Sequence, residues 1–322
     1  MTIKVQLAAA AMVLLCGFST APAQEWRQDL ADEFDGTHFS AEGGLYYKEN
    51  FEQSAGTVEF QNEVKFSGTG AVKLSVKPIC TEGPDTCSER AELWEIPKFR
   101  VPYEQAVWEG FAVKFGDPVP QADHRYLIAQ WKREIGPEAE GDFSPFLAFR
   151  LKGGKLFITV ETNYFDEFTA GPLGQQAQCG PDQTPVWPRK NTNQMRALIV
   201  ADGSWTAEDG GEFHACTDKI EIINRGNPLP RPDEGWIDFV VLSQPGPTGT
   251  GHIEIFANRA WIATVKGNIG HNDHVLGDNQ YFKFGPYRAA ANDNWSLYYD
   301  DFRRSLDCEF VLRDAAACAK IQ

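Results

Sequence analysis

The chain has 322 residues and a formal net charge of −15. That acidic balance excludes a general affinity for nucleic acid, although it leaves room for a local basic cleft that binds an anionic ligand. Beyond the N-terminus no stretch is apolar enough to span a membrane. We therefore expect an exported, soluble, monomeric protein whose partner is neither nucleic acid nor a membrane.

The N-terminus has the pattern of a secretory signal peptide, predicted at residues 1–23. Lys4 supplies the positive charge, residues 5–18 are apolar, and Ala21-Pro22-Ala23 has the small-x-small form of a cleavage site. The mature chain would then comprise residues 24–322. This signal predicts a secreted or periplasmic protein, and its form is typical of bacteria.

Six cysteines remain once the signal and Cys16 are removed. An even number in an exported chain predicts three disulfides. Sequence order favours Cys80–Cys87, Cys179–Cys216 and Cys308–Cys318, and other pairings stay open. No CxxC pair and no Cys/His cluster has the spacing of metal ligands, so a zinc site is not indicated.

Short alternating segments separated by Gly, Pro, Asn and Asp dominate the chain, and helical periodicity is almost absent. Gly153-Gly154 and Asn258-Arg259 predict tight turns between paired strands. The predicted strands are Thr57–Phe60, Ala71–Lys77, Arg90–Ile96, Ala106–Phe115, Tyr126–Arg133, Pro145–Leu151, Lys155–Thr162, Trp236–Ser243, His252–Asn258, Ala260–Lys266, Gln280–Phe284 and Trp295–Arg303.

This number and spacing of strands predicts one all-β sandwich domain over residues 24–322, with a groove on its concave face. The segment at about 164–234 is rich in Gly, Pro, Asn and Asp, and a stretch that long without strands is usually functional. We interpret it as an insertion that walls or covers the groove and holds Trp187 and Trp205. A short helix is expected near residues 313–320.

Two predicted strands carry polar residues at every second position. Arg90 and Glu92 point to one face of the first, and Gln130 and Lys132 share a face of the second. A solvated outer face would explain either pair alone. Together with a third strand of the same kind, they indicate a polar groove.

The third strand is Tyr281-Phe282-Lys283-Phe284, in which Tyr281 and Lys283 share a face. Gly285-Pro286 should interrupt it, because Pro cannot donate to a sheet and Gly loosens one. Tyr287 and Arg288 follow directly. If all three strands belong to one sheet, their Arg, Glu, Gln, Lys and Tyr side chains line one groove.

That set of side chains suits β-elimination from a uronic acid polymer. The proton on the carbon beside the carboxylate is a very weak acid, so its removal requires the charge that develops on the carboxylate to be neutralised. Arg, Gln and Lys donors can do so. A Tyr close to cations can transfer the proton, since positive charge favours the phenolate. No metal or cofactor is required for this scheme.

These motifs, in this order, resemble those of jelly-roll polysaccharide lyases, most closely the group of the glucuronan lyases (polysaccharide lyase family 20) and the heparin lyase I type. The matching motifs are Arg90-Ala91-Glu92-Leu93, Gln130-Trp131-Lys132 and Tyr281-Phe282-Lys283-Phe284-Gly285-Pro286-Tyr287-Arg288. The resemblance implies a concanavalin A-like β-jelly roll whose concave face binds an acidic polysaccharide.

The resemblance also implies catalytic roles. Tyr287 would be a catalytic acid or base, Gln130 would neutralise the uronate, and Arg90 is the arginine of the R-x-E motif. The family's usual His is Lys132 here, so its role as base does not carry over. Either Tyr287 serves as both base and acid, or another residue such as His124 is the base, while Lys132 could neutralise the carboxylate.

Other residues take supporting roles in this interpretation. The expected substrate-binding residues are Glu92, Tyr281, Lys283 and Arg288. We expect Arg133 and Arg150 to point away from the groove, and Trp94 and Trp131 to pack in the core. The acidic residues Asp300 and Asp301, with Asp32 and Glu33, could contribute to a structural calcium site, because calcium prefers oxygen ligands.

Two alternatives use the same fold. A glycoside hydrolase needs paired carboxylates, but Glu92 and Glu95 are three residues apart and should face opposite sides of a strand. A lectin-like carbohydrate-binding domain would use the groove without catalysis. Among uronic acid polymers a glucuronan-like substrate is favoured, with alginate-like and glycosaminoglycan-like polymers left open.

Overall fold

A computed structural model provides the fold. It describes residues 29–36, 46–51, 55–80, 87–95, 97–139 and 143–321. The predicted signal peptide at residues 1–23 lies outside this range. In the described part of the chain, no helix is both long and apolar enough to cross a membrane.

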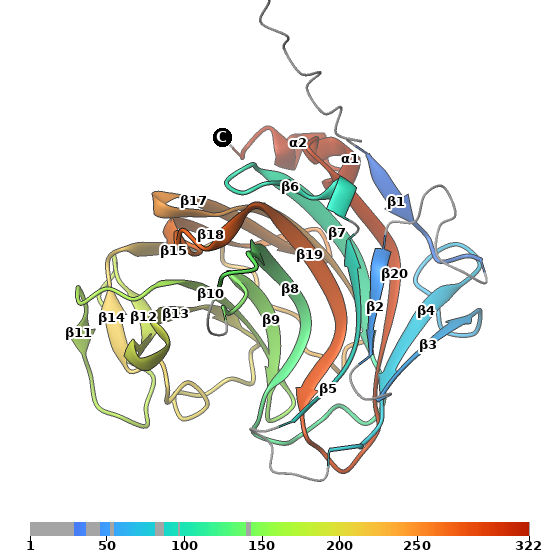
Figure 1. The fold of residues 1–322 in the computed structure, drawn as a ribbon, viewed down its shortest axis with the longest axis horizontal. Coiled ribbons are helices and arrows are strands. Elements are labelled where there is room, and N and C mark those ends of the chain that lie inside the picture. Colours follow the sequence, from blue (N-terminus) through green and yellow to red (C-terminus); the bar gives the residue numbers. More distant parts are fainter. Residues whose placement is uncertain are drawn as a thin grey trace, which may run out of the picture.

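Two antiparallel sheets, of nine and eleven strands among the described residues, pack face to face (Figure 1). In spatial order the first contains β15 (Ile220–Asn224), β18 (Ala260–Ile269), β17 (Gly246–Ala257), β16 (Trp236–Gln244), β7 (Val107–Phe115), β20 (Trp295–Ser305), β4 (Ala71–Val76) and β3 (Gly56–Gln61), with β1 (Leu30–Asp32) paired to β20.

The second sheet carries the polar groove. In spatial order it contains β11 (Thr169–Ala170), β14 (Ala215–Thr217), β12 (Thr184–Arg189), β13 (Gln194–Ala201), β10 (Lys155–Asn163), β9 (Leu147–Lys152), β8 (Tyr126–Ile135), β19 (Leu276–Ala289), β5 (Ser88–Glu95) and β2 (Tyr46–Phe51), with β6 (Val101–Pro102) paired to β19. This arrangement is the predicted all-β jelly-roll sandwich.

Aromatic side chains join the two sheets. Phe111 of β7 meets Phe282 of β19 with ring centroids 5.5 Å apart, and Phe282 meets Trp131 of β8 at 4.7 Å. Tyr299 of β20 donates its hydroxyl to the carbonyl of Ile128 at 2.6 Å. That carbonyl lies where β8 bulges against β9, so this contact between the sheets fixes the bulge beside the groove.

All three predicted disulfides are confirmed, Cys80–Cys87, Cys179–Cys216 and Cys308–Cys318. The last joins the short helices α1 (Cys308–Leu312) and α2 (Ala315–Cys318), which lie at one end of the sandwich (Figure 1). Single 3-10 turns, η2 and η3, occupy Pro97–Phe99 and Lys190–Thr192.

The predicted strands between residues 57 and 162 and after residue 235 are present, with ends shifted by a few residues. The turns at Gly153-Gly154 and Asn258-Arg259 are also confirmed, and all four residues have positive φ. Gly285-Pro286 does not end its strand, however, because β19 continues to Ala289 through a bulge against β8.

The segment at 164–234 contains five strands, β11 to β15, that the sequence did not predict. Four of them extend the groove sheet beyond β10, and β15 forms an edge of the other sheet. In Figure 1, β11, β12 and β14 project on the side away from β3 and β4. The segment is thus continuous with the sandwich, and within it the Cys179–Cys216 disulfide ties the stretch before β12 to β14.

Candidate active site

A cavity of about 560 Å³ opens on the face of the second sheet that points away from the core. Among the residues whose positions are described, five arginines and three lysines line it, against the two acidic residues Asp123 and Glu212. The cationic residues are Arg90, Arg125, Arg150, Arg189, Arg196, Lys132, Lys152 and Lys283. An acidic protein therefore has a basic cavity, as an anionic substrate requires.

Strand alternation puts β5 side chains on both faces, as predicted. Ala91 and Leu93 are fully buried in the core. Arg90 lines the cavity on the opposite face, and Glu92 lies behind the lining residues with no exposed surface. Glu95 points inward, where it contacts Arg304, so Glu92 and Glu95 do not form a pair across the groove.

Gly285 is what brings Tyr287 into the cavity. Its φ is +124°, and a Cβ there would lie 2.1 Å from the carbonyl oxygen of Ala91, so no other residue fits without a shift of the backbone. The bulge that it allows sets Tyr287 opposite Arg90 on β5 and Leu127 on β8. Residues opposite each other share a face of the sheet, so all three line the cavity.

Cations surround the ring of Tyr287. The guanidinium of Arg90 lies 4.1 Å from the ring centroid, that of Arg125 lies 4.8 Å away, and the ammonium of Lys283 lies 5.8 Å away. Tyr287 thus lies on the cavity wall with two guanidinium groups and one ammonium around its ring.

Glu92 holds three of the groove side chains in place. Its carboxylate accepts hydrogen bonds from the Gln130 amide and, at 3.0 Å, from the Lys283 ammonium. A guanidinium nitrogen of Arg90 lies 3.6 Å from it. Glu92, which was expected to bind substrate, therefore lies buried behind the lining residues and contacts three of them.

Lys283 is a buried cation that loses its proton easily. Burial lowers its pKa to about 8, the neighbouring charges of Lys132 and Arg90 act in the same direction, and Glu92 partly opposes them. The ammonium also lies 4.6 Å from the Trp94 ring centroid. At neutral pH the cavity therefore has a positive charge here that is lost in mildly alkaline solution.

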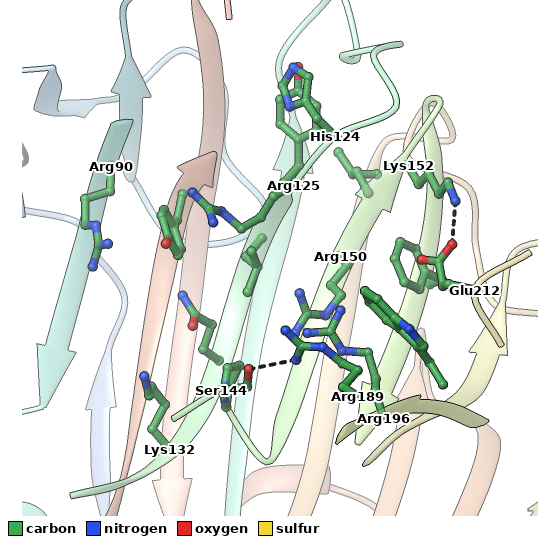
Figure 2. Close-up of a pocket in the computed structure, with 18 of the residues that line it drawn as sticks. Arg90, His124, Arg125, Lys132, Ser144, Arg150, Lys152, Arg189, Arg196 and Glu212 are labelled. Carbon is green, nitrogen blue, oxygen red and sulfur yellow. Dashed lines mark hydrogen bonds and ion pairs between the residues drawn. The ribbon is translucent and has the colours of Figure 1, made fainter. Parts of the chain in front are cut away.

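His124 and Lys132 line the cavity, as predicted. Burial is the main cause that lowers the pKa of His124, and the charges of Arg288 and Arg125 add to it, so its imidazole is neutral at pH 7 and able to accept a proton. Its Nε2 lies 3.3 Å from the hydroxyl of Tyr126. Figure 2 shows it at the edge of the cavity, with Arg125 beside it.

Two other predicted substrate-binding residues do not line the cavity. Arg288 has no exposed surface and is paired with Glu89 at 2.7 Å and with Asp293 at 3.2 Å. Tyr281 is buried against the Trp94 ring, at 5.6 Å, and below the guanidinium of Arg100, at 4.7 Å. Both residues lie on β19, the strand that also carries Tyr287 and Lys283.

The core role expected for Trp94 is wrong, whereas that for Trp131 is confirmed. Trp94 is an even number of residues from Arg90 and Glu92, so it lies on their face of β5, beside Lys283 and Tyr281. Trp131 is buried in the core with its neighbours Phe149 and Phe282.

Arg150 lines the cavity, contrary to expectation. Gln130 of β8 is paired with Ala148 of β9, so Ala148 and Arg150, two residues further, share the face of Gln130. Arg133 does point elsewhere, since it donates to the carbonyl oxygens of Gly277 and His271.

Three more cavity arginines were missed, namely Arg125, Arg189 and Arg196. On β10, Thr159 and Glu161 alternate with the apolar residues Ile158 and Val160, and this alternation was an available signal for this part of the groove. It is the same kind of signal as that of Arg90 and Glu92.

The carboxylates of Asp300 and Asp301 accept hydrogen bonds from backbone N–H groups and pair with arginines. Asp300 accepts from the backbone N–H groups of Phe66 and Ser67, at 2.8 and 3.0 Å. Asp301 is paired with Arg303 and Arg313. Among the residues with described positions, no group of three His, Cys, Asp or Glu gathers to hold a metal ion. The expected calcium site thus has no ligand set in this part of the chain.

Comparisons with known proteins identify a family and a fold. The family model described as polysaccharide lyase matches residues 32–303. A crystal structure of an endo-β-1,4-glucuronan lyase from the fungus Trichoderma reesei superposes with a TM-score of 0.57 at 14% identity, over 88% of this chain and 98% of that one. At this identity the superposition shows the fold alone.

A second solved structure, the cellulose-induced protein Cip1, matches with a TM-score of 0.43 and 16% identity, over 86% of this chain and 97% of its own. No curated protein sequence is significantly similar to this chain.

Proposed function

Because this chain belongs to the polysaccharide lyase family, we propose that it cleaves a uronic acid-containing polysaccharide by β-elimination, with a β-1,4-linked glucuronan as the favoured substrate. The observation that carries the proposal is the position of Tyr287, in a basic cavity with guanidinium groups 4.1 and 4.8 Å from its ring centroid. A lectin would have no need for cations around a phenol that only stacks on sugars.

In the proposed mechanism the uronate carboxylate lies against Gln130, with Lys283 and Lys132 beside it. The Gln130 amide gives one N–H to Glu92 and has a second to offer. As the proton on the adjacent carbon leaves, negative charge builds up on the carboxylate. Fixed donors in a partly buried site stabilise that charge without having to reorganise.

Tyr287 is the proposed proton-transfer group. Acting as a phenolate, it takes the proton from the carbon beside the carboxylate. The electron pair of that C–H bond forms a C=C bond in the ring, and the glycosidic C–O bond to the next carbon breaks. The phenol of Tyr287 then returns the proton to the departing oxygen. His124 is the second candidate for the base, since its imidazole is neutral on the cavity wall.

Export is also part of the proposal. Three disulfides are typical of proteins that fold in an oxidising compartment. With the signal pattern at residues 1–23, they support a secreted or periplasmic enzyme acting on a polymer outside the cell. No cofactor takes part in the proposed steps.

The test is a panel of uronic acid polymers, with a neutral glucan as the control, incubated with the purified protein while ultraviolet absorbance is followed. β-Elimination creates an unsaturated uronate that absorbs, whereas hydrolysis does not. We expect absorbance to rise with at least one polyuronate and not with the glucan. New reducing ends without absorbance would indicate a hydrolase, and binding without either product would indicate a lectin-like domain.

The loss of the Lys283 proton predicts how kcat/KM depends on pH in alkaline solution. We expect kcat/KM to fall as pH rises through about 8, because Lys283 loses its charge there. In Lys283→Arg the guanidinium stays charged to above pH 12, so this decline should move to higher pH, even if the maximal rate is lower. The same decline in both proteins would contradict the assignment.

A further inference from the structure

Charged side chains from three strands meet inside the sandwich, behind the cavity. They are Glu95 of β5, Glu109 of β7 and Arg304 of β20, and none has more than 4% of its side chain exposed. Arg304 Nε lies 3.0 Å from a Glu95 oxygen and 3.8 Å from a Glu109 oxygen. We call these three residues the buried charge cluster.

The buried charge cluster has one guanidinium for two carboxylates, so it needs a proton to be neutral. Burial is the main cause that raises the pKa of Glu109 to about 8, and the charge of Glu95 adds to it. Arg304 and the hydrogen bonds from Trp131 and Ser243 oppose this shift only in part. Glu109 is therefore the protonated acid at neutral pH.

Glu95 is better placed to keep the negative charge. Burial raises its pKa too, but the guanidinium of Arg304 opposes that shift from 3.0 Å. The backbone N–H of Phe282, which donates to Glu95 Oε2 at 3.0 Å, opposes it as well. Arg100 adds a smaller effect, and its guanidinium is paired with Glu134 at 2.7 Å. The cluster thus consists of one ion pair and one neutral acid.

Both acidic residues contact the strands that carry the cavity residues. Glu109 Oε2 accepts from the indole N–H of Trp131 on β8 at 3.2 Å, and Glu95 accepts from the backbone of Phe282 on β19. Trp131 and Phe282 are paired directly across these two strands, with ring centroids 4.7 Å apart. The cluster therefore fixes β8 and β19 from the core side at one point.

That point lies directly behind the cavity. Lys283 of β19 is paired with Gln130 of β8, next to the pair of Phe282 with Trp131. Successive side chains of a strand point to opposite faces, so Gln130 and Lys283 line the cavity where their neighbours meet the cluster. A displacement of about 1 Å in a reacting group can cost 10²-fold in rate. The placement of these two strands therefore matters for turnover.

Stability alone does not account for charges in this part of the core. Replacing a buried ion pair with apolar residues of similar volume is often neutral or stabilising. The next core-facing positions of the same strands are apolar, Leu93 on β5 and Phe111 on β7. Hydrogen-bonding side chains at Glu95 and Glu109 do what apolar ones cannot, since they fix donors of two other strands.

We propose that the buried charge cluster positions Gln130 and Lys283 for the proposed reaction, by holding β8 and β19 from inside the sandwich. This inference rests on the proposed function and extends it to residues that do not line the cavity. Because the two carboxylates share one guanidinium and one proton, either of them can balance Arg304 alone.

The first test compares leucine with glutamine at each carboxylate. Leucine removes the acceptor of Trp131 in Glu109→Leu and that of Phe282 in Glu95→Leu, whereas glutamine keeps a carbonyl oxygen at both places. On a uronate polymer we expect kcat to fall about 10- to 100-fold in the leucine variants, with KM within about threefold of wild type. Both glutamine variants should keep kcat within about threefold of wild type, because the acceptor remains.

Glu254→Leu is the matched control. Glu254 of β17 is a buried carboxylate that also accepts from an indole N–H, that of Trp261 at 2.7 Å, but it belongs to the other sheet and does not line the cavity. Its variant should lose stability and keep wild-type kcat, measured below its unfolding temperature. Leucine variants with the kcat of Glu254→Leu, or glutamine variants as slow as the leucine ones, would overturn the positioning role. Should Glu95→Leu not fold, the two Glu109 variants decide.

The second test is chemical denaturation of Glu95→Gln, Glu109→Gln and the double variant. Each single variant keeps one carboxylate for Arg304, so its unfolding equilibrium constant should stay within about tenfold of wild type. The double variant leaves the guanidinium unpaired, so its constant should rise about 10²- to 10³-fold beyond the product of the single changes. A double variant that shows only that product would overturn the shared guanidinium.

Hydrogen exchange tests the cluster without any turnover. If wild type cleaves no uronate, the proposed function fails separately, and the backbone amides of β8 in Glu109→Leu and of β19 in Glu95→Leu then decide. They should exchange faster than in wild type and in Glu254→Leu, since each strand has lost a contact that fixes it. Unchanged exchange in both strands would overturn the inference.

Discussion

Tyr287→Phe should lower kcat on a uronate polymer by about 10²- to 10⁴-fold, the range typical of losing a general acid–base group. The affinity for the polymer should stay within a few-fold of wild type. The measurement is the rate of ultraviolet absorbance increase at saturating polymer, together with a binding titration of the folded variant.

The physical reason lies in what the substitution removes. Phenylalanine keeps the ring that contacts Arg90 and Arg125, so the packing of the cavity wall is preserved. Only the hydroxyl is lost, and with it the atom that receives and returns the proton. The substrate carboxylate still meets Gln130 and the surrounding cations, so binding should survive while turnover does not.

Tyr298→Phe provides a matched control. Tyr298 also has a cation near its ring, Lys73 at 5.7 Å, but it lies on β20, outside the cavity. Its variant should turn over like wild type. If Tyr287→Phe keeps more than a tenth of wild-type kcat, another residue transfers the proton. His124→Ala would then be the variant to measure next.

Much of this site could be predicted from strand alternation. Arg90, Glu92, Gln130 and Lys132 were expected to share one face of one sheet. The contacts of Glu92 with Gln130 and Arg90 confirm this for three of them, and Lys132 lines the same cavity. Alternation works here because one face of each strand is packed against the core, which leaves a single face for polar side chains.

Alternation fails where the register between strands decides the outcome. The side of Arg150 follows from the pairing of Gln130 with Ala148, and no pattern within β9 gives that pairing. Tyr287 depends on a bulge at Gly285, which keeps the strand going where Gly-Pro suggested an interruption. Arg288 stands at the expected place in the sequence motif, but it is buried in an ion pair with Glu89 on the neighbouring strand β5.

The strands after residue 164 were missed for a different reason. Strand β12 contains Pro185 and Pro188, which count against a central strand from sequence alone. Tertiary pairing with β13 and β14 overrides that local preference. Arg189 of β12 and Arg196 of β13 belong to this region, so their positions on the cavity wall could not be read before the strands were known.

Glu92→Leu should destabilise the protein by about 3 kcal/mol at neutral pH, the scale of breaking a buried ion pair. Glu92 and Lys283 have 1% and 3% of their side chains exposed, so neither can turn to water when its partner is lost. Leu cannot accept from Lys283 or Gln130 either, and both polar groups would lose their buried acceptor. Chemical denaturation measures the change.

The double variant Glu92→Leu with Lys283→Met separates stability from function. Removing both charges leaves neither member of the Glu92–Lys283 pair as an unpaired ion, and replacing a buried pair with apolar residues is often neutral for stability. We expect the double variant to recover most of the lost free energy of unfolding. Its activity should stay low, because Gln130 has lost the acceptor that orients it and the cavity has lost the Lys283 cation.

The way the destabilisation by Glu92→Leu varies with pH identifies the charge of Lys283 as its cause. Its pKa is about 8 in the folded protein against 10.5 for the ordinary amine, so the folded state binds fewer protons between these values and stability rises with pH across them. Without Glu92 the folded pKa should fall further, which makes the loss of stability largest at pH 6. Above pH 8 both proteins hold a neutral amine, so the destabilisation by Glu92→Leu should shrink. A loss that stays constant from pH 6 to pH 9 would assign it to packing of the leucine instead.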